Sequence, residues 1–197
     1  TGAIVAFTKA IEVEKNNSQY YYYRGNAYFG NKNFENALKD YDQALELNPG
    51  NLDALYNKGN ANIELEKYSD ALRDFDKYIK SDSSNYDAYY NRAYTNYSLG
   101  KFKEAKKDFD RSIQFNPNYY DAWYDRGNTN FKLNDLLNAI ADYTNAIQLN
   151  GNEYEPWFNK AICELQMEQT TSGCSDLKTA AKLGDPEADD YIMEFCR

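Results

Sequence analysis

Side chains that commonly perform catalysis are scarce in this chain. Its 197 residues include no histidine and three cysteines, so neither a Ser-His or Cys-His pair nor an imidazole metal site is available. No glycine-rich phosphate-binding loop is present in the sequence. Aspartate and glutamate are plentiful, but they recur at regular spacing on faces where charge usually serves solvation. We therefore predict a protein that is not an enzyme and that requires no cofactor and no metal.

Two columns of charged residues recur every 34 residues along the chain. The first column is basic in every copy: Arg24, Lys58, Arg92, Arg126 and Lys160. The second is always aspartate: Asp40, Asp74, Asp108, Asp142 and Asp176. Either each cation pairs with an aspartate across two antiparallel helices, or the cations form a basic stripe for an anionic ligand. The ion-pair interpretation is favoured because every cation has an aspartate of its own.

The fixed period also defines the elements that must position these side chains, because it is typical of a solenoid of stacked units. Five full repeats are predicted, at 18–51, 52–85, 86–119, 120–153 and 154–187. Each holds two stretches with apolar residues at i, i+3, i+4 and i+7, which predicts two helices. Residues 1–17 match the second half of a repeat, and a last helix is expected at about 187–196. The predicted fold class is all-α.

Small and bulky residues occupy fixed places in the repeats. In the first repeat these residues are Tyr21, Gly25, Ala37, Tyr41, Ala44 and Pro49. In the fourth they are Trp123, Gly127, Ala139, Tyr143 and Ala146. This pattern resembles the tetratricopeptide repeat (TPR) family, of bacterial type, across essentially the whole chain. The resemblance implies one TPR domain, 1–197, folded as a right-handed α-solenoid of antiparallel helix pairs with a C-terminal capping helix.

The sequence departs from the family pattern at the eleventh position of the repeat, which is usually tyrosine. Repeats two to five carry other residues there: Asn62, Asn96, Asn130 and Glu164. The bulky side chain moves to the next position in these repeats, so the helical pattern is kept.

In the TPR family the first helix of each repeat lines a concave groove, chiefly through positions two, five, six, nine, twelve and thirteen. The resemblance implies the following candidate peptide-binding residues: Tyr22, Asn26, Tyr56, Asn57, Asn60, Tyr90, Asn91, Tyr94, Tyr124, Asn128, Phe158 and Asn159. Asparagine can donate to and accept from a peptide main chain, and tyrosine offers a flat apolar surface with a polar tip. The alternative is that these side chains only pack against neighbouring helices.

Charge limits the choice of partner. Some TPR proteins hold a carboxylate tail with Lys or Arg at positions two, five and six, but those positions carry no basic residue in the first four repeats here. The acidic residues at position two, such as Asp53 and Asp87, either start a helix or attract a basic ligand. A net charge of −9 disfavours nucleic acid, and no apolar run is long enough for a membrane span. We expect a protein or peptide partner that is basic or neutral rather than acidic, with self-association through the N-terminal end as another option.

The cysteines bear on the compartment. Cys163 is expected to be a small buried apolar residue. Antiparallel packing would bring Cys174 and Cys196 to the same end of the solenoid, so these two either form a disulfide or remain free thiols. A disulfide would favour a periplasmic or extracellular setting; otherwise a cytoplasmic or periplasmic location stays open.

The function most consistent with these features is a protein–protein interaction scaffold or adaptor that binds an extended peptide or partner segment in the groove. The alternative is a regulatory or assembly segment of a longer enzyme or sensor protein. The start of the chain in mid-repeat favours an excised segment of a longer chain, whereas the capping helix makes the C-terminal end look natural.

Overall fold

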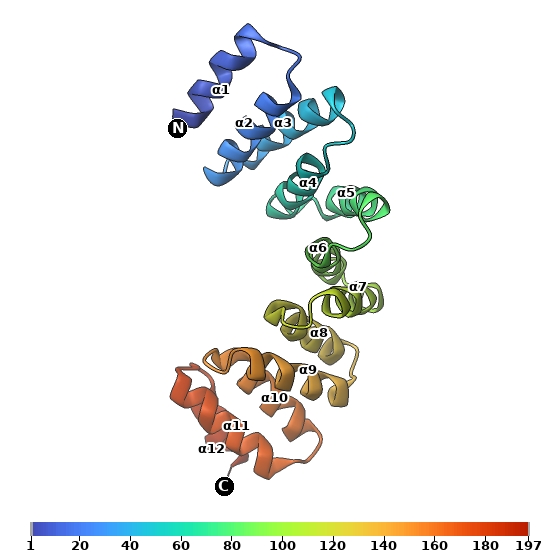
Figure 1. Cartoon of the computed structure of the whole chain (residues 1–197). Coiled ribbons are helices and arrows are strands. Elements are labelled where there is room, and N and C mark those ends of the chain that lie inside the picture. Colours follow the sequence, from blue (N-terminus) through green and yellow to red (C-terminus); the bar gives the residue numbers. More distant parts are fainter. Residues whose placement is uncertain (1, 197) are drawn as a thin grey trace. The chain divides into compact units, whose positions relative to one another are not determined.

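Every regular element of the protein is an α-helix in the computed structural model, which describes residues 2–196. The helices of this range are α1 (Gly2–Val13), α2 (Ser18–Gly30), α3 (Phe34–Leu47), α4 (Leu52–Glu64), α5 (Tyr68–Ser81), α6 (Tyr86–Ser98), α7 (Phe102–Phe115), α8 (Tyr120–Lys132), α9 (Leu136–Leu149), α10 (Tyr154–Gln166), α11 (Thr170–Leu183) and α12 (Ala188–Phe195) (Figure 1). The predicted all-α class is confirmed.

The chain forms two compact parts, and each is described by itself. The N-terminal part comprises residues 1–99 with α1–α6, and the C-terminal part comprises residues 100–197 with α7–α12. Within each part every helix packs on the next one in the chain. The first helices of successive repeats also touch, α2 on α4 and α4 on α6 in one part and α8 on α10 in the other. This successive packing is that of an α-solenoid, as predicted.

The turn inside each repeat depends on one residue with a left-handed backbone. It is the fifteenth residue of the repeat, with φ of 58° at Lys32, 56° at Glu66, 72° at Gly100, 58° at Asn134 and 61° at Glu168. A left-handed residue commonly ends a helix because it lets the following N–H groups bond back to the last carbonyls. The second helix then starts at once: Asn33 caps α3 by accepting from the backbone N–H of Asn36, and Asp135 caps α9 in the same way. Each of the five predicted repeats thus holds two helices, as the sequence pattern indicates.

In the first, second and fourth repeats, a glycine of the first helix faces a large buried ring of the second helix. A Cβ atom placed on Gly59 would lie 2.7 Å from Cζ of Phe75, whose side chain is fully buried. The same close approach joins Gly25 to Tyr41 and Gly127 to Tyr143, where the corresponding distances are 2.7 and 2.6 Å. Glycine at the eighth position therefore leaves the space that the ring at the twenty-fourth position fills.

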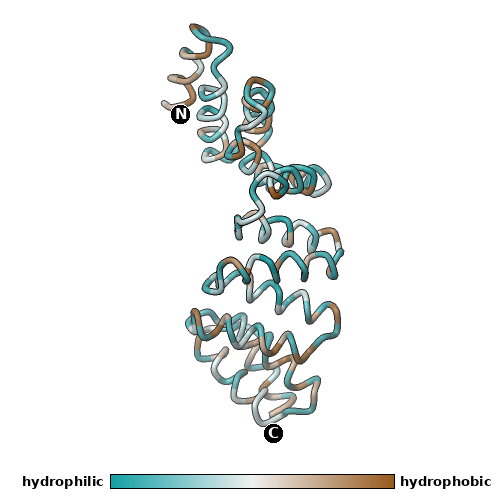
Figure 2. Tube along the Cα trace, turned by 45° about the vertical axis from the view of Figure 1, so that its right-hand side comes forward, coloured by the Kyte–Doolittle hydropathy of each residue, from teal (hydrophilic) through white to brown (hydrophobic). Residues whose placement is uncertain are grey.

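Apolar residues are spread over all the helices rather than collected in one segment, as the short brown stretches of Figure 2 show. None of the helices in the described range is long and apolar enough to cross a membrane.

The ion pairs predicted between the two charged columns are confirmed within each part. Arg24 holds Asp40 with two parallel hydrogen bonds, from Nε and Nη2, both 2.7 Å long. Arg126 holds Asp142 in the same way, at 3.0 and 2.6 Å. The Lys–Asp versions are Lys58–Asp74 at 3.6 Å and Lys160–Asp176 at 2.7 Å. The cations of these four repeats therefore bind carboxylates of their own repeat instead of presenting a bare basic stripe.

A second column of carboxylates, which was not predicted, joins the cations to the preceding repeat. The contacts are Lys58 to Asp42 at 2.8 Å, Arg92 to Asp76 at 2.7 Å and Arg126 to Asp110 at 2.7 Å. The signal was present in the sequence, because these aspartates also recur every 34 residues. Their side chains are half exposed, so each contact contributes less than about 1 kcal/mol and mainly fixes the register between repeats.

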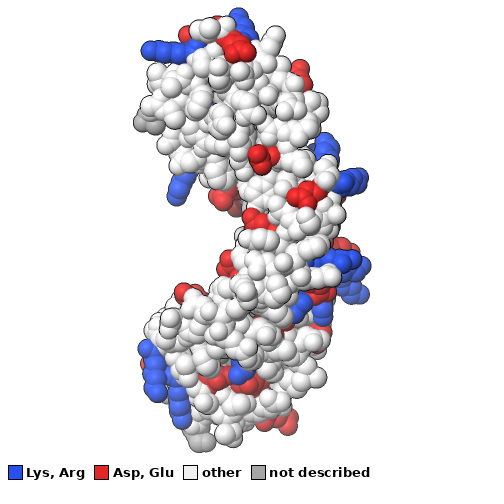
Figure 3. Space-filling view, in the orientation of Figure 1, with Lys and Arg blue, Asp and Glu red and all other residues white. Residues whose placement is uncertain are grey.

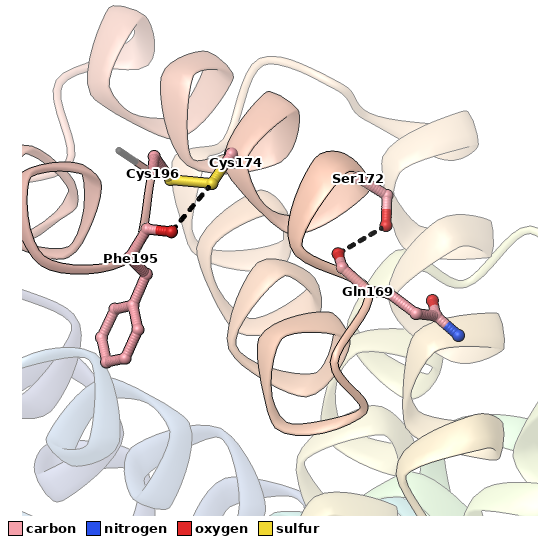
Figure 4. The surroundings of a disulfide bond; sticks show 5 residues. All are labelled: Gln169, Ser172, Cys174, Phe195 and Cys196. Carbon is pink, nitrogen blue, oxygen red and sulfur yellow. Dashed lines mark hydrogen bonds between the residues drawn. A yellow bond between two sulfur atoms is a disulfide. The ribbon is translucent and has the colours of Figure 1, made fainter.

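A disulfide bond closes the C-terminal end. Cys174 in α11 is joined to Cys196, which directly follows α12, with a Cα–Cα distance of 5.6 Å (Figure 4). Of the two options left open by the sequence, the structure thus has the disulfide. Cys163 is a free and fully buried thiol, as expected, and burial raises its pKa to about 12. Asp185 starts α12 by accepting hydrogen bonds of 2.8 Å from the backbone N–H groups of Glu187 and Ala188.

The fifth repeat carries an unusual buried carboxyl group at its eleventh position. In the second and fourth repeats an asparagine at this position donates to the buried aspartate, from Asn62 to Asp74 at 2.8 Å and from Asn130 to Asp142 at 2.7 Å. In the fifth repeat the residue is Glu164, which is 4% exposed and contacts Lys160 at 3.4 Å. Burial, followed by the charge of Asp176, raises the pKa of the Glu164 carboxyl above its ordinary value.

This environment predicts a pH-dependent stability that a single substitution removes. A carboxyl whose pKa is raised by folding stabilises the fold below the pKa of the unfolded chain, about 4.3, and loses that contribution as pH rises through the folded-state pKa. Glu164→Gln carries no charge at any pH and can donate to Asp176, as Asn62 does to Asp74. We expect it to be more stable than the wild type by about 1–2 kcal/mol at pH 7, with the difference vanishing near pH 4.

Urea unfolding of both proteins at the two pH values measures this difference. Glu168→Gln, at an exposed position of the following turn, is the control and should leave the pH profile unchanged. A Glu164→Gln variant that is less stable than the wild type at pH 7 would contradict the account.

Candidate peptide-binding surface

The twelve predicted site residues all lie on the first helices of the repeats. They are Tyr22 and Asn26 on α2, Tyr56, Asn57 and Asn60 on α4, Tyr90, Asn91 and Tyr94 on α6, Tyr124 and Asn128 on α8, and Phe158 and Asn159 on α10. Every one of them is at least partly exposed. Tyr94 has the most exposed side chain of the twelve, at 39%. The surface they form is therefore accessible within each part of the chain.

Asparagine side chains connect neighbouring first helices directly. Each bridge runs from the sixth position of one repeat to the ninth position of the repeat before it. In the N-terminal part Asn57 Nδ2 donates to Asn26 Oδ1 at 2.9 Å, and Asn91 Nδ2 donates to Asn60 Oδ1 at 3.1 Å. In the C-terminal part Asn159 Nδ2 donates to Asn128 Oδ1 at 3.2 Å. We call these three hydrogen bonds the asparagine ladder.

Tyrosine hydroxyl groups tie the asparagine ladder to the cores of the first and fourth repeats. The buried Tyr41 donates from its hydroxyl group to Asn26 Oδ1 at 2.9 Å, and Tyr143 donates to Asn128 Oδ1 over the same distance. On the surface side, Asn91 donates to the hydroxyl oxygen of Tyr56 at 2.8 Å. The asparagines therefore have a structural role, which the sequence left as an alternative to peptide binding.

The aromatic residues at the fifth position pack against the buried rings. Ring centroids are 6.4 Å apart for Tyr22–Tyr41, 5.9 Å for Tyr56–Phe75 and 6.0 Å for Tyr124–Tyr143. In the last repeat Phe158 instead meets Tyr191 of α12 edge to face at 5.2 Å. Burial raises the pKa of Tyr124 above the ordinary tyrosine value. One side of each ring thus belongs to the core, and its remaining edge contributes to the accessible surface.

One open cleft brings several predicted residues together in the N-terminal part. Its volume is about 400 Å³, and it is lined by Phe29, Tyr56, Asn60, Ile63, Glu64, Asp87, Tyr90, Asn91 and Tyr94. Five of these are predicted site residues, namely Tyr56, Asn60, Tyr90, Asn91 and Tyr94. The other predicted residues do not line it. We call this space the α4/α6 cleft, because most of its lining comes from these two helices.

Four lining residues of the α4/α6 cleft were not among the predicted site residues: Phe29, Ile63, Glu64 and Asp87. They occupy the second, twelfth and thirteenth positions of their repeats, which the family pattern also assigns to the groove. Their positions in the repeat could therefore have identified these four residues from the sequence. They were not selected because the residue type at these positions varies from repeat to repeat.

Family models agree with this architecture. The tetratricopeptide repeat model matches residues 18–51, 86–119 and 120–153, and a second tetratricopeptide repeat model matches residues 40–73. The chain therefore belongs to the tetratricopeptide repeat family. A comparison with curated protein sequences gives no significant match.

Several solved structures share the fold at low sequence identity. The protein YrrB, described as a TPR protein with an unusual peptide-binding site, is 24% identical, with a TM-score of 0.83 over 96% of this chain and 98% of that one. MamA from Desulfovibrio magneticus RS-1 is 17% identical, with a TM-score of 0.81 over 84% and 94%. The C-terminal part of a TPR protein from Cytophaga hutchinsonii is 17% identical, with a TM-score of 0.83 over 98% and 81%. These similarities establish the fold.

The asparagine ladder predicts a specific coupling between Asn128 and Tyr143. Asn128→Ala removes the acceptor for the hydroxyl group of a ring that is 1% exposed, so it should destabilise the protein by about 1–3 kcal/mol. Adding Tyr143→Phe removes the hydroxyl group that has lost this acceptor and should restore part of the loss, because Phe75 already fills the same place in the second repeat. Urea unfolding of the two single variants and the double variant measures the coupling. Strictly additive losses would show that the hydrogen bond does not link the two residues.

Proposed function

We propose that this chain is a protein-interaction scaffold that binds an extended segment of a partner protein along its first helices, with the α4/α6 cleft as the main contact. The observation that carries the proposal is the cleft itself. Its volume of about 400 Å³ falls in the range of sites that hold ligands. Its lining combines tyrosine rings with asparagine amides, the combination that favours adaptable binding of a peptide.

The asparagine ladder sets how a main chain would be recognised. Oδ1 of Asn26 and Oδ1 of Asn128 each accept two hydrogen bonds from the protein. An asparagine side chain also carries two N–H donors. Nδ2 of Asn91 and Nδ2 of Asn159 each donate to two protein oxygens, so the ninth-position asparagines are the ones that would donate to carbonyl oxygens of a bound peptide. YrrB, which has the same fold, is described as having a peptide-binding site, and this supports the assignment of a peptide ligand.

The partner we propose is basic or neutral. The chain has a net charge of −9, which favours a cationic segment through long-range attraction and disfavours a nucleic-acid partner. A membrane is likewise not the proposed target. The disulfide between Cys174 and Cys196 supports an oxidising compartment such as the periplasm.

Two other roles remain as secondary proposals. The helical array could serve as the regulatory or assembly segment of a longer enzyme or sensor. Self-association through α1 is supported by the exposure of Val5 at 54% and Val13 at 90%, because exposed apolar side chains on one helix favour contact with another protein surface.

Selection of random peptides against the immobilised chain, followed by affinity measurement, tests the main proposal. Tyr94→Ala is the informative variant because its ring lines the cleft and is 39% exposed. Tyr86→Ala is the matched control: it is a tyrosine on the same helix, 38% exposed, and it does not line the cleft. We expect Tyr94→Ala to raise the Kd of selected peptides about tenfold or more, and Tyr86→Ala to leave it unchanged. Equal binding by all three proteins would remove the cleft from the proposed site.

A further inference from the structure

We propose that the α4/α6 cleft is a site for one basic side chain, lysine or arginine, of the bound segment. This inference rests on the proposed function, since it assigns the chemistry of a residue in the partner segment. It depends on four features of the cleft: the sign of its charges, the way one carboxylate is held, the aromatic lining and the position of the nearest cations.

Both charged side chains that line the cleft are acidic. Asp87 stands in the first turn of α6, and Glu64 is the last residue of α4. The other lining residues are aromatic, aliphatic or amide side chains. An acidic side chain in the cleft would be repelled by these two like charges, whereas a cationic side chain would be attracted by both. A cation is therefore the favoured occupant.

The Asp87 carboxylate is held in place before any ligand arrives. The hydroxyl group of Tyr56 donates a hydrogen bond to Oδ2 of Asp87. The same hydroxyl oxygen accepts from Asn91 Nδ2 at 2.8 Å, and Asn91 is also bonded to Asn60. The carboxylate therefore belongs to a network that spans α4 and α6. A charge that is already positioned in the cleft loses less freedom when a ligand binds.

Aromatic and aliphatic side chains surround the two carboxylates. Tyr56, Tyr90 and Tyr94 contribute rings, and Phe29 and Ile63 contribute apolar surface. The face of an aromatic ring attracts an ammonium or guanidinium group, and the alkyl stem of lysine or arginine packs along apolar side chains while its charged end stays near the carboxylates. The lining thus suits both halves of a basic side chain.

The cationic side chains of α4 and α6 contact aspartates of the second helices α3 and α5, and they do not line the cleft. Lys58 contacts Asp42 and Asp74, and Arg92 contacts Asp76. Figure 3 shows blue atoms at the right-hand edge beside α5, while the atoms drawn over α4 and α6 are white and red. The acidic pair also has too few ligands for a metal site, and no group of at least three metal-ligating side chains occurs among the described residues. A cationic side chain is therefore a better match to this cleft than a metal ion.

Two small probes of the same shape test the inference on the full chain. Nα-acetyl-arginine amide carries the charge, and Nα-acetyl-citrulline amide replaces the guanidinium by a neutral urea group. Chemical-shift titrations of the isotope-labelled protein give the Kd of each probe and the residues that respond. We expect the arginine probe to bind about fivefold more tightly than the citrulline probe, with shifts centred on Asp87, Tyr90 and Tyr94.

Asp87→Asn is the variant that isolates the charge. Its side-chain oxygen can still accept the hydrogen bond from Tyr56, so the shape of the cleft should persist while one negative charge is lost. Asp53→Asn is the matched control, because Asp53 holds the same place in α4 and does not line the cleft. The fivefold preference should disappear in Asp87→Asn and persist in Asp53→Asn. Equal binding of the two probes to the wild type, or an unchanged preference in Asp87→Asn, would overturn the inference.

The peptide selection separates this inference from the proposed function. Peptides whose binding depends on Tyr94 and that share a lysine or arginine at one position support both. Peptides that depend on Tyr94 but lack any shared basic residue overturn the basic-side-chain site and leave the scaffold proposal standing. Failure of every selected peptide to depend on Tyr94 removes the cleft from the proposed binding site instead, whatever the arginine probe does.

Discussion

The structure depends on how closely the two helices of a repeat approach each other. At Gly25, Gly59 and Gly127 a Cβ atom would come within 2.6–2.7 Å of the aromatic ring at the twenty-fourth position. In these three repeats the missing side chain and the buried ring thus form one unit, and a larger residue at the glycine position requires the ring or the helix to shift. The third repeat carries Ala93 and Phe109 at the same two positions. Because this contact recurs in three repeats, it fixes where the first helix of each of them lies relative to the second.

The candidate surface follows from that packing. The buried rings of Tyr41 and Tyr143 carry hydroxyl groups that reach the asparagine ladder, so the core of one repeat is hydrogen-bonded to the side chains that join it to the next. On the other side of the pair, cations bridge aspartates of two repeats. Apolar packing therefore fixes the two helices within a repeat, and the hydrogen bonds and ion pairs fix neighbouring repeats. Together they position the first helices and the residues of the α4/α6 cleft.

Features that repeat with the 34-residue period could be predicted from the sequence, because periodicity reports helix faces directly. The helix pairs, their turns and the Arg–Asp and Lys–Asp pairs belong to this class. Features of single repeats could not be predicted. The cleft combines Glu64 at the end of one helix with Asp87 at the start of another, and only coordinates show that they share one space. The disulfide likewise needed the 5.6 Å separation of Cys174 and Cys196, since the spacing of cysteines in a sequence leaves free thiols equally open.

A double-mutant cycle at Gly59 and Phe75 tests the close-approach constraint most directly. The fifth repeat shows an alternative solution, with Ala161 facing the smaller Leu177, both fully buried. We predict that Gly59→Ala alone destabilises the protein by about 1–2 kcal/mol in urea unfolding. Combined with Phe75→Leu, the same substitution should cost clearly less, with a coupling free energy of about 1 kcal/mol or more. Additive effects of the two substitutions would contradict the account, because they would show that the small residue and the ring do not share one space.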